Sequence, residues 1–475
     1  MTSRDSDRGP LGKLAVLHAG GLALFLAWRF GGMEPFARSV AAWACLPAPV
    51  LTVLALRNAS PDLRRAAAWI VVPLLVLTLQ VGLSLLNPSR QLYQFWDTPV
   101  LRVADHIGWA PSTPWPRATL TDFALNTGLL CVGLNLMFAR PSRVWLRGLL
   151  WLIALNGLAL TVVGTLFRLA NAEKILGHTA SPNPNFFATF VYHNHWGAFA
   201  LLCAGAALGL ALYVERRTAP EPLTRTAMPF LGLAGAILLL SIPLSSARAS
   251  TVAAAVLALG AAILIGQRLR TRLARQPAGA GARRVALIAV AAGTIGFGGF
   301  LGYETWSREI GQTRAQLADL GAGGIGDARL VIYSDTLKLI RERPVFGWGW
   351  QSFQYIYPDV QSELPRMWSR AGRQAVLDAH NDWLQLLAEI GLFGVACLLA
   401  AGLGCLRWGG PRRWLRSPQS LLLLALSSLA LLALVDFPLA CPAVVLTAAC
   451  LLGVGAESAR GSGSYAGPPP PTISS

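Results

Sequence analysis

Three residues that can carry charge or move protons lie beside long apolar runs, where such side chains are costly. His380 is in the run AHNDWLQ before one apolar segment, Arg248 is in LSSARAST between two, and Arg329 is in GDARLVIYS. A histidine can take a proton from a hydroxyl near neutral pH. An arginine offers a planar fork that can bind a phosphate group through two hydrogen bonds. A histidine and two arginines that converge would suit transfer chemistry on a lipid-linked phosphate.

The two arginines also have structural interpretations. A guanidinium near a membrane edge must face protein, water or an anion, but Arg248 could instead extend to the lipid headgroups. We favour the phosphate-binding role for Arg248. Arg329 opens a candidate helix, and composition alone does not distinguish it from a surface arginine.

A polar edge follows His380 into the next apolar run. Asn381, Gln385 and Glu389 occur at spacings of four and therefore share one edge of a helix. Such an edge inside an apolar span needs partners within a helix bundle. A lone histidine is more often structural, but this edge favours a functional role for His380.

A second histidine run, His193-Asn194-His195, precedes another apolar segment. Histidines at i and i+2 do not share a helical face, so we do not expect a metal-binding pair. Asn194 and His195 could contact a polar substrate at the mouth of a bundle or simply cap the helix. Asp436, in VDFPLACP, could cap the last helix or anchor an arginine, and we prefer the capping interpretation.

The composition indicates what must position these residues. The chain has 475 residues, of which 54% are hydrophobic and 13% charged, whereas soluble domains carry about 25% charged residues. About twelve apolar runs are long enough to be transmembrane helices: 14–30, 36–56, 66–86, 120–139, 145–170, 194–214, 227–247, 250–266, 285–303, 384–406, 419–435 and 438–456. The sequence therefore predicts an all-α polytopic membrane protein.

The basic residues predict the orientation. The net charge is +17, with 40 Lys and Arg against 23 Asp and Glu. Most of the basic residues lie in alternate short loops, which the positive-inside rule assigns to the cytoplasm. We therefore expect both termini in the cytoplasm and do not expect nucleic-acid binding.

The same topology divides the chain and places a long loop outside. The loop 304–383 is too long for a simple connector, and its Trp and Tyr residues favour a folded segment. The spacing of apolar residues predicts a helix at 328–342 that lies over the mouth of the bundle and ends before Pro344 and the Gly-Trp-Gly run at 347–349. The expected parts are 1–303 with nine spans, the 304–383 periplasmic lid, 384–456 with three spans, and a disordered cytoplasmic tail at 457–475.

The run HNDWLQLLAEIGLFG at 380–394 resembles the signature of the O-antigen ligase and O-antigen polymerase superfamily. Four further pieces resemble elements of this family in chain order: YHNHWGAFALL at 192–202, SSARAS at 245–250, ARLVIYSDTLKLIRERPVFGWGWQSF at 328–353, and DFPLACP at 436–442. The resemblance covers about residues 190–445, and five pieces in order with matching topology are more specific than any one piece.

This resemblance implies a GT-C-like, inverting and metal-independent glycosyltransferase in the bacterial inner membrane, without a cofactor. It implies a glycan on undecaprenyl diphosphate as donor and a hydroxyl of lipid A-core or of a growing polysaccharide as acceptor, both presented at the periplasmic side of the lipid bilayer. Carried over by position, His380 matches the general base or a positioning group, Arg248 and Arg329 match the diphosphate ligands, and the supporting residues are Asn381, Glu389, Asn194, His195 and Asp436.

Other interpretations remain open at this point. A polysaccharide or lipid transporter would place charged residues through the span centres and would give no reason for a folded outer loop. A membrane scaffold would leave the polar edge after His380 unexplained. The family includes ligases, polymerases and enzymes that glycosylate protein, and the sequence does not choose among their acceptors.

Overall fold

The computed structural model describes residues 9–95, 98–181, 183–217, 226–274, 328–362, 376–415 and 418–461. The predicted span 285–303, the first part of the predicted outer loop and the predicted disordered tail beyond residue 461 lie outside the described residues.

The described residues are mainly helical, as the apolar runs predict. Within them, nine helical segments are long and apolar enough to cross a membrane. These are α1 (Pro10–Trp28), α2 with α3 (Pro35–Cys45 and Pro47–Arg57), α4 (Pro61–Leu85), α5 (Pro116–Phe138), α6 (Arg143–Leu169), α7 (His193–Arg217), α9 (Arg248–Ala274), α13 (Asp382–Gly409) and α16 (Pro442–Gly461). Two shorter apolar helices are α8 (Met228–Leu244) and α15 (Gln419–Leu432).

Many of these helices begin at a proline, as α1, α4 and α5 do. The first helical N–H has no partner within the helix, so the missing N–H of proline costs nothing there. The predicted span 36–56 is divided at Leu46, because Pro47 starts α3 directly after α2. The remaining helical elements are η1 (Phe30–Gly32), α11 (Ala328–Glu342), α12 (Phe353–Ile356), η4 (Tyr357–Asp359), α14 (Pro411–Leu415) and η5 (Pro438–Ala440).

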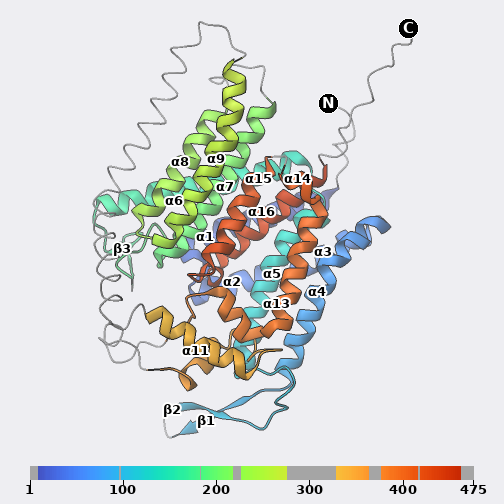
Figure 1. Ribbon diagram of the computed structural model, residues 1–475, viewed down its shortest axis with the longest axis vertical. Helices are drawn as coiled ribbons and strands as arrows, with labels where there is room; N and C mark the ends of the chain where they lie inside the picture. The colour runs from blue at the N-terminus through green and yellow to red at the C-terminus, as the bar shows by residue number, and fades with distance from the viewer. Residues whose placement is uncertain are drawn as a thin grey trace.

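Helix α7 forms the centre of the bundle. Every residue from Asn194 to Leu212 is buried, and α7 packs against α6, α8, α9, α15 and α16 (Figure 1). Small residues permit this close packing. A Cβ added at Gly205, for example, would lie 2.5 Å from the Cβ of Ala425 in α15.

Helix α13 is broken where the outer loop meets it. Gly391 has φ +64°, and its neighbours Leu392 and Phe393 donate backbone hydrogen bonds of 2.9 and 3.0 Å to the carbonyls of Pro344 and Val345. A Cβ at Gly391 would lie 2.2 Å from the Val345 carbonyl oxygen. Only glycine suits this contact, because both the positive φ and the close approach exclude a side chain.

Gln80 of α4 closes the same junction from the other side. Its buried side-chain amide donates hydrogen bonds to the carbonyl oxygens of Phe346 (3.1 Å) and Ile390 (2.9 Å). Carbonyls freed by a helix break within a bundle need such partners. The outer loop is therefore joined to two spans rather than laid on their surface.

Several elements gather at one end of the bundle, which we call the site end. It holds the N-terminal ends of α7, α9, α13 and α16 together with α11, and Figure 1 shows α11 lying across this end. The predicted helix at 328–342 is thus confirmed. A hairpin that the sequence analysis did not predict, β1 (Arg90–Phe95) paired antiparallel with β2 (Thr98–Val103), lies at the same end; a second small pair is formed by β3 (Lys174–Ile175) and β4 (Thr179–Ala180).

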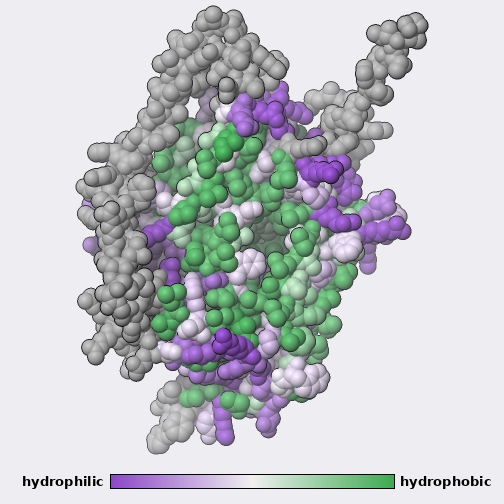
Figure 2. Space-filling view, in the orientation of Figure 1, coloured by the Kyte–Doolittle hydropathy of each residue, from purple (hydrophilic) through white to green (hydrophobic). Residues whose placement is uncertain are grey.

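The surface of the molecule fits a membrane. Figure 2 shows hydrophobic residues across the middle of the bundle and hydrophilic residues gathered toward both ends. The end away from α11, with the C-terminal ends of α13 and α16, is called the opposite end below.

Candidate functional site

His380 has an unusual backbone conformation directly before α13. Its φ is +52°, in the left-handed region that residues other than glycine rarely adopt. The Tyr333 hydroxyl of α11 donates to the His380 carbonyl at 2.9 Å, and the preceding Ala379 N–H donates to Gln385 Oε1 at 3.0 Å. These contacts hold the half-buried His380 in a strained conformation of the kind found at functional sites.

The ring of Phe437 joins three segments that are far apart in the sequence. Its centroid lies 4.8 Å from His380, 5.1 Å from Tyr192 and 5.3 Å from His195. The structure therefore brings together His380, His195 and the loop between α15 and α16. Edge-to-face contacts of this kind orient the histidine rings as well as burying them.

Arg329 and Tyr333 lie one helical turn apart on the same face of α11. Arg329 donates from Nη1 to the carbonyl of Val435 at 3.2 Å, next to Phe437. Its charge also acts on Tyr192 and Asp436. The two contacts of α11 thus fix the chain on both sides of the aromatic centre.

Arg248 reaches the same region from α9. A Cβ at Gly197 of α7 would lie 2.5 Å from Ser250 Oγ and 3.0 Å from the Cβ of Ala247. This contact lets the start of α9 lie directly against the start of α7 and leaves the Arg248 side chain exposed. The charges of Arg168, Arg248 and Arg329 all act on His193, so the three guanidinium groups lie within electrostatic range of the start of α7.

Asp436 is buried in the loop beside Phe437. The preferred capping interpretation is wrong, because α16 begins only at Pro442 and Asp436 Oδ1 instead accepts a 2.9 Å hydrogen bond from the N–H of Phe437. Burial raises the pKa of Asp436 to about 6, against the lowering effects of that hydrogen bond and of Arg329. The alternative interpretation, an aspartate that interacts with an arginine, fits the structure.

A second carboxyl group, on Asp378, lies near the same loop. Burial raises its pKa to about 6, and a hydrogen bond from Gln385 and the charge of Arg38 oppose this shift. Its charge acts in turn on Asp436. Two carboxyl groups with pKa values near 6 are able to exchange protons close to neutral pH.

The polar edge of α13 has the partners that its position requires. Asn381 caps α13 by accepting from the Leu384 N–H (3.0 Å), and it donates to the Leu434 carbonyl (2.7 Å). Glu389 accepts hydrogen bonds from the N–H groups of Gln351 (2.8 Å) and Phe353 (3.3 Å) and from Gln385 Nε2 (3.1 Å). These residues hold the outer loop and the 433–441 loop against the start of α13.

Asn194 and His195 are both buried at the start of α7. Asn194 donates from Nδ2 to the Tyr192 hydroxyl at 2.9 Å, while His195 packs edge-on against the rings of Tyr192 and Phe437. Both side chains therefore support the aromatic centre from the side of α7.

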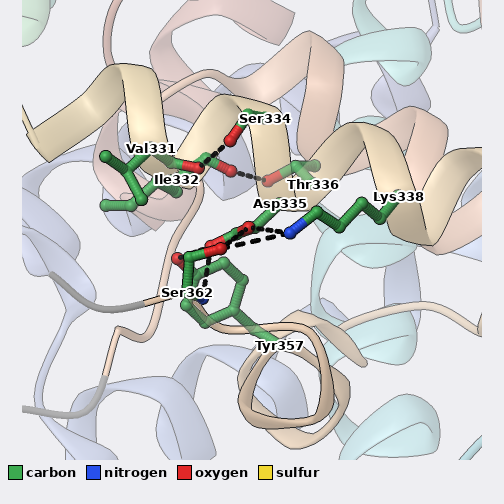
Figure 3. Close-up of polar contacts among 8 residues, drawn as sticks. All are labelled: Val331, Ile332, Ser334, Asp335, Thr336, Lys338, Tyr357 and Ser362. Carbon is green, nitrogen blue, oxygen red and sulfur yellow. Dashed lines mark hydrogen bonds and ion pairs between the residues drawn. The ribbon is translucent and has the colours of Figure 1, made fainter.

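A buried aspartate ties α11 to the rest of the outer loop (Figure 3). Asp335 accepts hydrogen bonds from Lys338 Nζ (2.7 Å), the Tyr357 hydroxyl (3.2 Å), and the N–H and hydroxyl of Ser362 (2.8 and 2.7 Å). Burial raises the pKa of Asp335, but these hydrogen bonds outweigh that effect and leave it below its usual value. The network fixes the helix that carries Arg329 and Tyr333.

Sequence reasoning missed several residues of this site. Tyr192 and Phe437 were hidden because an aromatic residue beside an apolar run is normally a core residue. Arg168 lies in the last turn of α6, and its position in the sequence gives no sign that its charge acts on His193. Their sequence neighbours could have revealed them: Tyr192 comes directly before the histidine run, and Phe437 comes directly after Asp436.

The arrangement combines fixed cations with groups that can accept a proton. Within the described ranges, no group of three or more His, Cys, Asp or Glu residues is placed to hold a metal ion. The guanidinium groups near His193 provide an environment for an anion, and His380, Asp378 and Asp436 lie around the same loop as candidate proton acceptors.

One comparison with known families gives a match. Residues 233–399 match the model of a family described as O-antigen ligase. The matched region contains three of the five pieces singled out in the sequence, at 245–250, 328–353 and 380–394, and does not reach those at 192–202 and 436–442. No curated protein matches the chain.

Proposed function

We propose that the chain is a membrane glycosyltransferase, because residues 233–399 match the O-antigen ligase family and nine helical segments of the described residues are long and apolar enough to cross a membrane. It moves a glycan from undecaprenyl diphosphate to an acceptor hydroxyl, with inversion and without a metal ion. The acceptor is a lipid A-core or a growing polysaccharide. The site end faces the periplasm of the inner membrane, with both chain termini in the cytoplasm.

The observation that carries this proposal is that α9 lies against the start of α7 and α11 against the loop beside Phe437, which brings the charges of Arg168, Arg248 and Arg329 within electrostatic range of His193. When the bond between the anomeric carbon and the diphosphate breaks, negative charge develops on the diphosphate oxygens. Cations already in place stabilise that charge without having to reorganise during the reaction. Arg248 and Arg329 would hold the diphosphate, and their approach from α9 and α11 suits a group held from two sides.

The reaction also needs a group that accepts the proton of the acceptor hydroxyl. The acceptor oxygen attacks the anomeric carbon, the glycosidic bond to the diphosphate breaks, and the hydroxyl proton passes to a base. His380 is the proposed base, since its backbone is fixed by Tyr333 and its ring by Phe437. Asp436 and Asp378, with pKa values raised to about 6, are the proposed groups that would share or relay that proton.

The remaining residues support these groups. Asn381 and Glu389 hold the start of α13 against two loops, while Asn194 and His195 support the aromatic centre from α7. The proposed lid is the outer loop that contains α11, which reaches the site through Arg329 and Tyr333.

Glycan transfer by the purified protein tests the proposal. The assay contains a glycan on undecaprenyl diphosphate, a lipid A-core or lipid-linked glycan acceptor, and a metal chelator. Wild type is compared with His380→Ala, Arg248→Ala and Arg329→Ala, and with Arg57→Ala, an exposed arginine of α3, as a matched control. Each variant is first checked for wild-type size and thermal unfolding.

We expect wild type and Arg57→Ala to transfer glycan in the presence of chelator and the three site variants to lose transfer. Full activity in all three would reject the site assignment. Activity that the chelator abolishes would reject the metal-free mechanism. Absence of transfer with every acceptor, together with movement of the lipid-linked glycan across vesicles, would instead support a transporter.

A further inference from the structure

A second feature that can bind a ligand lies at the opposite end of the bundle. An open cleft of about 660 Å³ is lined by residues from the start of α4, the end of α13, α14 and the end of α16. Its polar and aromatic lining consists of Trp69, Arg407, Trp408, Arg412, Arg413 and Arg460. The cleft is far along the helices from His380, so it belongs to a different site.

The cleft is strongly cationic. Four arginines line it, and none of the described lining residues is acidic. The nearest buried acid, Glu457, already contacts Arg140 Nε at 3.5 Å and accepts from Trp408 Nε1 at 3.3 Å. Glu457 also acts on the charge of Arg460, and Arg413 Nη1 donates to the Arg460 carbonyl at 3.2 Å. The four guanidinium charges still exceed this single carboxylate, and such an excess attracts an anion with oxygen acceptors, above all a phosphate.

Aromatic rings hold two of these guanidinium groups in place. The guanidinium carbon of Arg407 lies 5.6 Å from the ring centroid of Trp69, and that of Arg460 lies 4.6 Å from Trp408. Trp69 is 62% exposed, and exposed tryptophans of membrane proteins typically lie at the level of the lipid headgroups. The cleft is thus both preorganised and at the depth where a headgroup would be.

An apolar surface runs from the cleft toward the middle of the bundle. Helices α4 and α13 touch closely at Gly404, where a Cβ would lie 2.8 Å from Ile70 Cγ1. Beside this contact the side chains of Val72, Leu399 and Leu403 are exposed by 53%, 50% and 66%. A ligand that fits both surfaces carries an anionic head and hydrocarbon chains.

We propose that this cleft binds the phosphate headgroup of an anionic phospholipid from the leaflet at the opposite end, with the acyl chains lying along α4 and α13. Basic pockets between transmembrane helices bind lipid headgroups through charge and hydrogen bonds. The lipid would connect the start of α4 with the ends of α13 and α16 and with α14. This inference does not depend on the proposed glycosyltransferase activity.

A neighbouring cleft at the same end provides a contrast. Its volume is about 200 Å³, and it is lined by Arg143, Arg147, Arg216 and Arg217. Arg147 there already donates to the Tyr213 hydroxyl at 2.8 Å, and Arg217 lies over the ring of Tyr213 at 5.7 Å. A variant that loses two arginines from this second cleft therefore serves as the matched control for one that loses two arginines from the first cleft.

The test measures lipid retained by the full-length protein. Protein is reconstituted in nanodiscs of phosphatidylcholine with a minor fraction of phosphatidylglycerol, and the lipid that remains bound after transfer to detergent is identified by native mass spectrometry. The variants are Arg412→Gln with Arg413→Gln, the control pair Arg143→Gln with Arg216→Gln, and the single variant Arg412→Gln in case the pair does not fold. A parallel sample contains excess inorganic phosphate.

We expect wild type and the control pair to retain phosphatidylglycerol in preference to phosphatidylcholine, and the cleft variants to lose this preference by about fivefold per arginine. Equal losses in both pairs would show a general attraction to charge and overturn the proposal. So would equal retention of the two lipids by wild type. Displacement of the lipid by inorganic phosphate alone would assign the cleft to a soluble anion and likewise reject the phospholipid.

Discussion

Both ends of the bundle are rich in arginine, but they use it differently. At the site end, Arg329 comes from an outer helix that is tied down by Asp335, and its guanidinium donates to a carbonyl beside a buried aromatic centre. At the opposite end, Arg412 and Arg413 are exposed on the rim of an open cleft. Residue type and net charge do not distinguish these two settings. Arg329 and Arg413 each donate to the carbonyl of a separate segment at 3.2 Å, but that carbonyl lies beside a buried aromatic centre at the site end and beside an open cleft at the opposite end.

Two buried glutamates make the same comparison. Glu389 at the site end accepts hydrogen bonds from two backbone N–H groups of the outer loop, so it joins Gln80 and the broken turn of α13 in anchoring that loop to the bundle. Glu457 at the opposite end contacts Arg140 and Trp408, which belong to the bundle itself. The buried glutamate at the site end thus holds an outer-loop segment in place. The buried glutamate at the opposite end contacts helices that hydrophobic packing already holds in place.

The largest difference between the two ends is expected in the rate of glycan transfer when an arginine is substituted. We expect Arg248→Gln and Arg329→Gln to lower the rate of glycan transfer by about 10²–10³-fold each, the loss found when one preorganised donor is removed from a developing oxyanion. Arg57→Gln should change the rate by less than about threefold, because surface substitutions usually cost within 0.5 kcal/mol. Steady-state transfer kinetics measure both.

The lysine variants sharpen this test. Arg248→Lys and Arg329→Lys keep the charge but lose the planar fork, so they should recover only part of the lost rate. If the lysine variants transfer glycan at the wild-type rate, the positive charge alone is sufficient. If they are as slow as the glutamine variants, the planar guanidinium fork is required and the charge alone contributes nothing.

Replacing one buried glutamate at each end should have different consequences. We expect Glu389→Gln to destabilise the protein by about 1–3 kcal/mol, because the new NH2 group replaces one of the two acceptor oxygens and at least one N–H donor then lacks an acceptor, and to lower transfer activity. Glu457→Gln should also lower the free energy of unfolding but leave transfer unchanged. Thermal unfolding in detergent and the transfer assay are measured on the same samples; equal losses of activity would contradict the comparison.

The Asp335 network should make the outer loop sensitive to acid. The pKa of Asp335 is lowered in the folded protein, so its stabilisation is fully present above the unfolded value of about 3.9 and is lost as the pH falls through the lower, folded value. We expect amide exchange in residues 328–362 to accelerate as the network is protonated. Asp335→Asn should accelerate exchange already at neutral pH and flatten the pH dependence.

A much smaller effect is expected at the hairpin. Arg90 forms an ion pair with the half-exposed Asp359 and also donates to the Tyr355 carbonyl at 3.2 Å. Asp359→Asn should therefore cost no more than about 1 kcal/mol, as for other exposed ion pairs. The rate of amide hydrogen exchange in β1 and β2 measures this loss of stability. A larger loss would show that the hairpin belongs to the organised core of the site end.

The spans and the outer helix could be predicted from the sequence for a clear physical reason. A bilayer requires about 20 apolar residues for each crossing, and every marked run within the described residues coincides with a helix. The helix at 328–342 was visible from the near-helical spacing of its apolar residues, of which Ile332 is buried, whereas Leu330 and Leu337 are exposed. His380, Arg248 and Arg329 were visible because charged groups stand out beside apolar runs.

The features that were missed depend on contacts between distant segments. Gly391 lies in the run EIGLFG, which looks like continuous helix until the carbonyls of the outer loop occupy the break. Phe437 looks like an ordinary core residue until two histidines are found against it. The hairpin at 90–103 has no apolar face long enough to indicate strands. Each of these features is defined by its partners and not by its own residue type.

The hydrogen bonds of Gln80 also constrain the order in which the chain can assemble. Their acceptors lie 266 and 310 residues further along the chain, which is about 15–60 s of synthesis at roughly 5–20 residues per second. Until then the amide of α4 must be satisfied by water, headgroups or a temporary partner, because an unsatisfied amide in hydrocarbon costs several kcal/mol. Seating of α4 against α13 is therefore a late event of biogenesis, and a ribosome stalled before Ile390 would leave the first spans inserted but the junction beneath the site unformed.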